Sequence, residues 1–300
     1  MDFSAASVVP RRVGTPAEAR AEVAARGAAI LSGLADQEAA FAAGRAFLGP
    51  DLRRFGLQFE ATKDKQEAEA AQVAGQPADE RGRKRRFTAT QERMVPHNDG
   101  FGFGDFGPDY LFLWCGRPDA AGGGASFLVD GLALLAHLAA DPDYADVARF
   151  AWDTDIDQSE PNFPLAAHAP IARRFPNGRV QVRHHPFQAP APGQAPAVEA
   201  ASAALIKRWS EAVRAARDGG PMFHAAAGDL ICVDNYRLTH GRDGYSDPDR
   251  VMLSIWGWST AAVTVPDGPL DIVRPVIPAA MLSDVTVATS TYHAAEITQP

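Results

Sequence analysis

Residues 228–235 are Gly228-Asp229-Leu230-Ile231-Cys232-Val233-Asp234-Asn235. Four apolar residues lie between turn-forming residues, so the stretch predicts a turn, a buried strand and a second turn. This arrangement delivers His240 to the end of a strand. Ten residues beyond His240, the run 250–258 alternates with period two and predicts a further strand. One face of that strand carries Arg250, Met252, Ser254, Trp256 and Trp258.

Other stretches extend this pattern in both directions. From Phe101 onward the sequence predicts strands separated by glycine and proline, at 110–115, 126–129 and 179–183. Helices are expected from a cap at Thr15 to about Gly27, and over 36–47, 132–140 and 197–217. The predicted strands lie on either side of helical segments and do not alternate regularly with helices as in a βαβ fold. This order predicts a mainly β chain with helical insertions. We expect a double-stranded, cupin-like barrel.

The length of 300 residues is compatible with a single domain over 1–300, with the barrel core and its insertions at 94–260. Residues 61–86 are polar and charged, which predicts a mobile loop, either a lid over a site or a solvated insertion. The Pro/Ala/Gln stretch 188–196 predicts a stiff connector.

Composition excludes several classes of function. The net charge is −8 and the basic run 81–86 is local, so we expect no nucleic-acid partner. Cys115 and Cys232 lie in apolar runs and are expected to be buried thiols in a reduced, cytoplasmic compartment. No signal peptide or membrane span is indicated. Oligomeric state is left open.

A candidate metal site combines His97-Asn98-Asp99 with the distant His240. On a strand edge, His-x-Asp places both side chains on one face, because side chains repeat every two residues. Two imidazoles and one carboxylate form the facial set that holds Fe(II) and leaves three positions open. Arg250 suits a dicarboxylate co-substrate. An alternative pair, His184-His185, is disfavoured because adjacent strand residues point to opposite faces.

Several other residues are candidates for the substrate pocket. Phe101, Phe103 and Phe106 follow the ligand motif and form either an apolar pocket wall or ordinary packing. Arg183 and His184 end an alternating strand. Arg242 is either a contact for substrate or co-substrate, or a surface or structural ion-pair residue.

In ordered blocks within 94–260, the sequence resembles the Fe(II)/2-oxoglutarate-dependent dioxygenases of the taurine dioxygenase and clavaminate synthase-like superfamily. The blocks are 97–99, 110–118, 123–131 and 228–254. The resemblance implies a jelly-roll fold and iron ligands at His97, Asp99 and His240. It also implies that Arg250 holds the distal carboxylate of 2-oxoglutarate.

Two further positions follow from the resemblance. Ser126 stands where the family usually has a threonine that helps to bind the co-substrate, and its hydroxyl retains a hydrogen-bond donor. Ser254 stands where some members place a second arginine, four positions after the first, and is a third candidate for co-substrate binding.

The implied chemistry uses Fe(II), 2-oxoglutarate and O2, with succinate and CO2 as co-products. Related halogenases replace the carboxylate ligand with a small residue, so the intact Asp99 favours hydroxylation of an unactivated C–H bond. Desaturation, epoxidation and ring formation are alternatives at the same site. The expected substrate is a small amino-acid- or peptide-derived natural-product intermediate; small sulfonates or carboxylates are the other choice. A non-catalytic cupin-like binding protein and a hydrolase with a different metal are the other classes considered.

Overall fold

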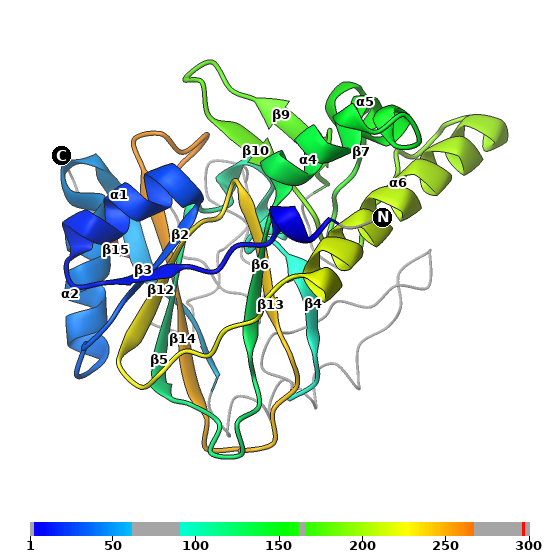
Figure 1. Cartoon of the computed structure of the whole chain (residues 1–300). Helices are drawn as coiled ribbons and strands as arrows, with labels where there is room; N and C mark the ends of the chain where they lie inside the picture. Colours follow the sequence, from blue (N-terminus) through cyan, green and yellow to red (C-terminus); the bar gives the residue numbers. More distant parts are fainter. Residues whose placement is uncertain (1–2, 62–90, 162–165, 267–295, 298–300) are drawn as a thin grey trace.

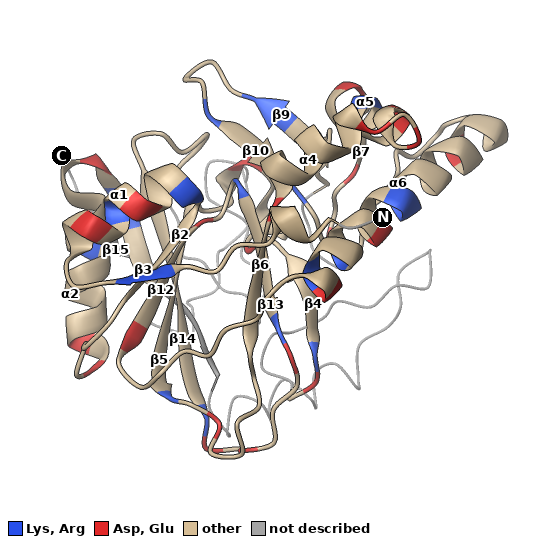
Figure 2. Ribbon diagram, in the orientation of Figure 1, with Lys and Arg blue, Asp and Glu red and all other residues tan. Residues whose placement is uncertain are grey.

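The computed structural model describes residues 3–61, 91–161, 166–266 and 296–297. Two principal β-sheets lie next to each other, with helices on their outer sides (Figure 1). Acidic and basic positions are interspersed along the described elements in this view, rather than separated into two faces (Figure 2).

The larger sheet has the strand order β1-β2-β12-β5-β14-β3-β15. Its first pair is parallel and its other pairs are antiparallel. The strands are β1 Arg11–Val13, β2 Ala28–Leu31, β12 Asp229–Asp234, β5 Tyr110–Arg117, β14 Val251–Ser259, β3 Leu52–Ala61 and β15 Glu296–Ile297.

Central strands β5 and β12 are buried on both faces. Phe112 and Cys232 pack on the side covered by helices α1 (Pro16–Arg26) and α2 (Gln37–Leu48). Leu111 and Ile231 point to the other side, into a second apolar cluster. Burial on both faces explains why these strands are continuous apolar runs in the sequence.

The smaller sheet has the order β4-β13-β6, with β4 at Met94–His97, β13 at Leu238–Arg242 and β6 at Ser126–Asp130. Leu128 and Leu238 of this sheet join the same apolar cluster as Ile231 and Trp256 of the larger sheet. The two sheets therefore pack against each other through this cluster.

Three helices form a separate apolar cluster against β6: α4 (Gly131–Ala140), α5 (Ala145–Asp153) and α6 (Pro196–Gly219). The shorter elements are β7 Ile156–Asp157, β8 His168–Ala169, β9 Ala172–Arg174, β10 Val180–Val182, β11 Ala189–Pro190, η1 Ser4–Ala6, η2 Gly49–Asp51 and η3 Phe101–Phe106.

Local signals fix the ends of α1 as expected. The Thr15 side chain accepts from the Glu18 N–H, and the Glu18 carboxylate accepts in return, forming a capping box. Gly27 ends the helix with φ of 85°, and a Cβ there would lie 2.9 Å from Leu238. Glycine is therefore required at 27 both by the backbone and by the close approach of β13.

Some expectations about elements were wrong. Residues 101–106 form the 3-10 helix η3 instead of part of a strand region, and α5 was not expected at all. The expected connector 188–196 contains the short strand β11 and ends where α6 begins. Of the expected loop 61–86, Ala61 is the last residue of β3, while 62–86 lies outside the described residues.

A mainly β chain with helical insertions is confirmed. The closed double-stranded barrel remains a prediction, because the principal pairings among the described strands form two sheets, each with its own edges. A single domain over 1–300 likewise remains a prediction.

A buried carboxylate lies beside one end of β14 and binds groups at the ends of neighbouring strands of the larger sheet. Asp109 accepts hydrogen bonds from the backbone N–H and the hydroxyl of Ser259, at 2.9 and 2.6 Å, and its carbonyl accepts from the Asn235 N–H. Burial raises the pKa of Asp109 to about 6, against the lowering effect of these bonds and of Arg179.

The raised pKa predicts a pH-dependent stability. Because the folded state binds the Asp109 proton more tightly than the unfolded state, this contribution is fully present below about pH 4. It is lost as the pH rises through about 6. We expect Asp109→Asn to remove this loss, so the difference in free energy of unfolding between wild type and variant changes across that window. Urea denaturation at several pH values measures it, with exposed Asp155→Asn as control. A difference that does not vary with pH contradicts the assignment.

Candidate metal centre

His97 and His240 face each other across two neighbouring strands. His97 is the last residue of β4 and pairs directly with His240 of β13, and their ring centroids are 4.3 Å apart. His240 therefore lies in the middle of its strand, not at its end as expected. The register shifts after His240, where a Cβ on Gly241 would lie 2.3 Å from the Phe127 ring. Only glycine fits this close approach.

Asp99 lies in the turn after β4, so strand alternation does not explain its direction. Instead, the Asn235 side chain accepts from the Asp99 N–H at 3.0 Å and donates to the Asp99 carbonyl at 2.9 Å. The Asn98 amide donates to the carbonyls of Asn235 and Leu238. The two amides tie the turn to the chain that leads into β13.

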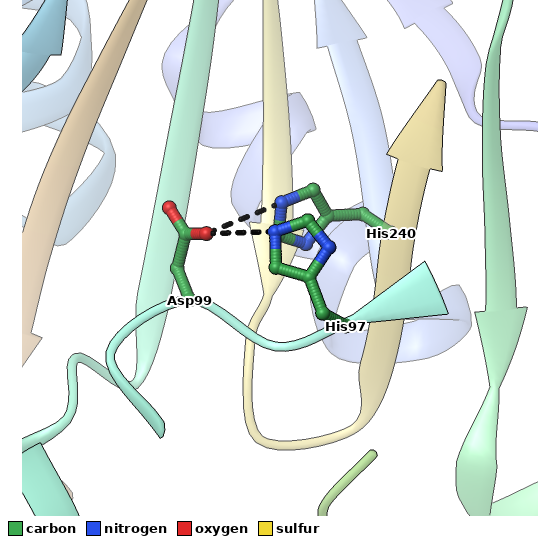
Figure 3. Close-up of side chains that lie close together, drawn as sticks. All are labelled: His97, Asp99 and His240. Atoms are coloured by element: carbon green, nitrogen blue, oxygen red, sulfur yellow. Dashed lines mark ion pairs between the residues drawn. The ribbon is translucent and has the colours of Figure 1, made fainter. Parts of the chain in front are cut away.

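The three side chains converge on one point (Figure 3). Asp99 Oδ1 lies 3.3 Å from His97 Nε2 and 3.4 Å from His240 Nε2. Ligand atoms about 2.1 Å from a metal and at right angles to each other are roughly 3 Å apart. The spacing is therefore that of three ligands on one face of an ion.

Hydrogen bonding at the far side of the His97 imidazole supports a cation at this point. His97 Nδ1 lies 2.9 Å from the Val95 carbonyl, which requires a proton on Nδ1. In the neutral ring, Nε2 then presents a lone pair to Asp99 Oδ1. Two lone-pair-bearing atoms at 3.3 Å repel unless a proton or a metal ion lies between them, and the donor set fits a metal ion.

Burial and mutual charge set the ionisation of the cluster. Burial alone raises the pKa of Asp99, but the charges and hydrogen bonds of His240 and His97 hold that pKa well below its usual range. Burial, reinforced by His97, lowers the pKa of His240. An ionised carboxylate beside a neutral imidazole is the state in which both bind metal.

The second oxygen of Asp99 is bound by β14 of the larger sheet. Asp99 Oδ2 accepts from Trp256 Nε1 at 2.8 Å and from Ser254 Oγ at 3.1 Å. Neither contact was foreseen: the sequence placed Trp256 on one strand face without a partner, and Ser254 was a candidate for co-substrate binding. Their place on one strand face was visible in the sequence, but which carboxylate they meet depends on the packing of the two sheets.

Arg250 and Arg242 lie on the ring of Tyr245, their guanidinium carbons 4.7 and 4.6 Å from its centroid. Both arginines are buried, and burial lowers the pKa of each, that of Arg242 to about 10. Arg242 donates to the carbonyls of Glu92 and Asp243, so it is not a surface residue. Tyr245 was not singled out from the sequence.

Ser126 opens β6 and pairs with Arg242 of β13. The chain just before Ser126 also approaches Arg250, because a Cβ on Gly124 would lie 3.1 Å from Arg250 Nε. Arg242 shares a strand face with His240, two residues away, a separation of roughly 7 Å. Ser126, Arg242 and Arg250 therefore gather at one end of the sheet that carries the histidines.

The candidate substrate residues are divided between packing and a small cavity. Phe103 packs edge-on to Trp256, with centroids 5.6 Å apart, and Phe106 is also buried in the cluster between the sheets. Phe101 stacks on His185 at 4.2 Å. Phe101, Arg183 and Asp99 line a small cavity.

Arg183 is buried and donates to the carbonyl of Gly104 at 2.6 Å and to the Gln181 side chain at 3.0 Å. Burial, together with Arg173, lowers the pKa of Arg183 to about 10. His184 bonds to the Pro96 carbonyl and Ser210, whereas His185 bonds to Gln158. These different partners agree with the expectation that the adjacent histidines do not form one metal site.

Comparison with known proteins identifies the family. The family described as taurine catabolism dioxygenase TauD, TfdA family, matches residues 3–256. The chain belongs to the TauD/TfdA family. This confirms the resemblance drawn from the motifs and the expectation of a dioxygenase, and it contradicts a non-catalytic binding protein. No curated protein sequence matches the chain.

Solved structures of the same fold include three instructive cases. Asparagine oxygenase in complex with Fe(II), 2S,3S-3-hydroxyasparagine and succinate has 17% identity and a TM-score of 0.56, covering 82% of this chain and 78% of its own. The non-heme iron oxygenase OrfP with Fe, succinate and (3S)-hydroxy-L-Arg has 14% identity and a TM-score of 0.50, covering 82% and 79%. A Burkholderia xenovorans protein provisionally described as an alpha-ketoglutarate-dependent taurine dioxygenase has 17% identity and a TM-score of 0.54, covering 89% and 87%.

Among the residues that the structure describes, His97, Asp99 and His240 are the group arranged to hold a metal ion. Cys115 and Cys232 are buried free thiols, as expected. None of the described helices combines the length and apolar character needed to cross a membrane.

Metal binding tests the centre directly. We expect His97→Ala, Asp99→Ala and His240→Ala each to weaken Co(II) binding by more than about 100-fold, since loss of an outer contact to a metal ligand already costs about 10–100-fold. Titration of the metal-free protein followed by visible absorption measures the affinity, with exposed Asp155→Ala as a folded control. Retained affinity in Asp99→Ala, or undiminished succinate formation by that variant, refutes the ligand set.

Proposed function

We propose that His97, Asp99 and His240 bind Fe(II) and that the enzyme uses 2-oxoglutarate and O2 to hydroxylate an unactivated C–H bond. The observation that carries this proposal is the convergence of two imidazole nitrogens and one carboxylate oxygen at a buried point. Bound iron, with 2-oxoglutarate and O2, supplies the oxidising chemistry and gives succinate and CO2 as co-products. The protein must hold the ligands, anchor the co-substrate and exclude water.

Arg250 is the proposed anchor for the distal carboxylate of 2-oxoglutarate. Its guanidinium is buried and is held against the Tyr245 ring and beside Gly124. A planar guanidinium that has lost most of its water forms strong paired hydrogen bonds with a carboxylate. Ser126, at the start of the neighbouring strand, is the proposed hydroxyl contact for the same co-substrate, and Arg242 contributes positive charge nearby.

Asp99 also bears on the outcome of the reaction. Because the carboxylate is present and fixed, no position is left in its place for a halide, which favours hydroxylation over halogenation. Desaturation, epoxidation and ring formation use the same ligands and remain the alternative outcomes.

The proposed substrate is a small amino-acid- or peptide-derived compound. Support comes from asparagine oxygenase and OrfP, whose structures hold hydroxylated amino acids. Within this chain, Phe101 and Arg183 are the proposed substrate residues, and both line a small cavity beside Asp99. The proposed double-stranded barrel would enclose this site between its sheets.

Measuring co-substrate binding distinguishes the role of Arg250 from the role of the metal ligands. We expect Arg250→Ala to weaken binding of 2-oxoglutarate to the Co(II)-loaded protein by about 10–100-fold, the effect of losing a hydrogen bond to a charged group. Binding of Co(II) itself should be unchanged. Calorimetric titration measures both affinities, with exposed Arg149→Ala as the matched control. Equal 2-oxoglutarate affinity in wild type and Arg250→Ala excludes Arg250 as the anchor.

Substrate class is tested by turnover. We expect succinate release by the Fe(II)-loaded enzyme to rise several-fold with at least one member of a panel of amino acids and cyclic dipeptides, because substrate binding triggers the oxidation. The assay includes taurine and simple sulfonates as the competing class. Stimulation confined to the sulfonates overturns the proposed substrate class but leaves the cofactor assignment intact.

A further inference from the structure

On the basis of the proposed iron site, we propose that Ser254 and Trp256 are positioning residues that hold Asp99 as a one-oxygen ligand. They bind Oδ2, so that only Oδ1 faces the two imidazoles. If both oxygens of Asp99 bound the ion, the second oxygen would occupy a further coordination position. Holding Oδ2 away leaves that position open for 2-oxoglutarate or O2.

The two oxygens of Asp99 have different surroundings. Oδ1 contacts His97 Nε2 and His240 Nε2, at 3.3 and 3.4 Å. Oδ2 accepts one N–H and one O–H hydrogen bond, at 2.8 and 3.1 Å. Turning the carboxylate so that both oxygens face the ion would break two hydrogen bonds to a charged group in a buried site, and such bonds are stronger than those between neutral groups.

The donors are held firmly by the larger sheet. Ser254 and Trp256 are two residues apart on β14, so their side chains leave the same strand face. This strand lies between β5 and β3 and pairs with both. The Trp256 ring is buried and packs edge-on to Phe103 and Trp258, with centroids 5.6 and 6.0 Å away.

The arrangement gives Ser254 a role different from co-substrate contact. Its hydroxyl donates a hydrogen bond to the Asp99 carboxylate. Some family members carry a second arginine at this sequence position. In this chain the position therefore serves the metal ligand and leaves the binding of anions to other residues.

The same strand supplies matched controls. Trp258 is also a buried tryptophan, and its Nε1 donates to the Phe106 carbonyl at 2.9 Å. Ser259 is also a buried serine, and its hydroxyl donates to a carboxylate outside the centre, that of Asp109, at 2.6 Å. Trp258→Phe and Ser259→Ala remove equivalent bonds from β14 without touching Asp99.

The test compares Trp256→Phe, Ser254→Ala and the double variant with these controls. Trp256→Phe keeps an aromatic ring but removes the N–H, and Ser254→Ala provides a milder change if the tryptophan variant does not fold. We expect Co(II) affinity, measured by visible absorption, to fall about tenfold in the double variant and by less than about threefold in the controls.

Infrared difference spectra, recorded with and without Co(II), give a readout that general loss of stability does not move. The separation of the two carboxylate stretching bands is wide for a one-oxygen ligand and narrow for a two-oxygen ligand. We expect a wide separation in wild type and both controls, and a narrower one in the double variant. Its affinity for 2-oxoglutarate should also fall about tenfold, because the co-substrate must displace an oxygen.

Two outcomes separate this proposal from the proposed function. If wild type binds Co(II) no better than His97→Ala, the iron site itself is wrong. If wild type binds Co(II) through the three ligands but the band separation in the double variant equals that in Trp258→Phe, the iron site stands and the positioning role is overturned. The same conclusion follows from a narrow separation in wild type.

Discussion

The close approach of Asp99 Oδ1 to two imidazole nitrogens is the interaction on which the rest of the structure depends. At 3.3 and 3.4 Å, in a buried site, these atoms repel one another unless a proton or a metal ion lies among them. A fold that only needed stability would not bring three such groups together, because apolar side chains could fill the same space without electrostatic strain. The arrangement therefore fits the proposed metal ion, and the surrounding contacts hold the three side chains in place without it.

These contacts come from three parts of the chain, and each controls a different degree of freedom. The pairing of β4 with β13 sets the distance between the imidazoles. Asn235 binds both backbone groups of Asp99 and so fixes where its side chain begins. Ser254 and Trp256 fix the rotation of its carboxylate. β4 and β13 belong to the smaller sheet, β14 belongs to the larger one, and Asn235 lies in the turn between β12 and β13. The geometry of the centre therefore depends on how the two sheets pack.

The sequence predicted what is local or carried by a motif. The cap at Thr15, the stop at Gly27 and the apolar run of β12 need only neighbouring residues, and each was found where expected. The convergence of His97, Asp99 and His240 was predicted from their motifs and the family resemblance, although Asp99 reaches its place through a turn and not through strand alternation. The contacts of Trp256 and the stacking at Tyr245 could not be predicted, because they join residues from segments whose relative position is set only by tertiary packing. The nine-residue α5 was missed because its apolar pattern is short.

Charge is distributed along β13 in a way that fits a ligand with two negative ends. The carboxylate and the imidazoles lie around His240, whereas the guanidinium groups of Arg242 and Arg250 both contact the Tyr245 ring, in the chain that follows β13. Burial lowers the pKa of Arg242, and repulsion from the like charge of Arg250 at the same ring lowers it further. A carboxylate bound at the two guanidinium groups would relieve that repulsion. A metal ion at His97, Asp99 and His240 would relieve the repulsion between the lone pairs of those three residues. Under the proposed function, a dicarboxylate chelated at one end and paired with arginine at the other would satisfy both, and the two halves of the site would form a single binding surface.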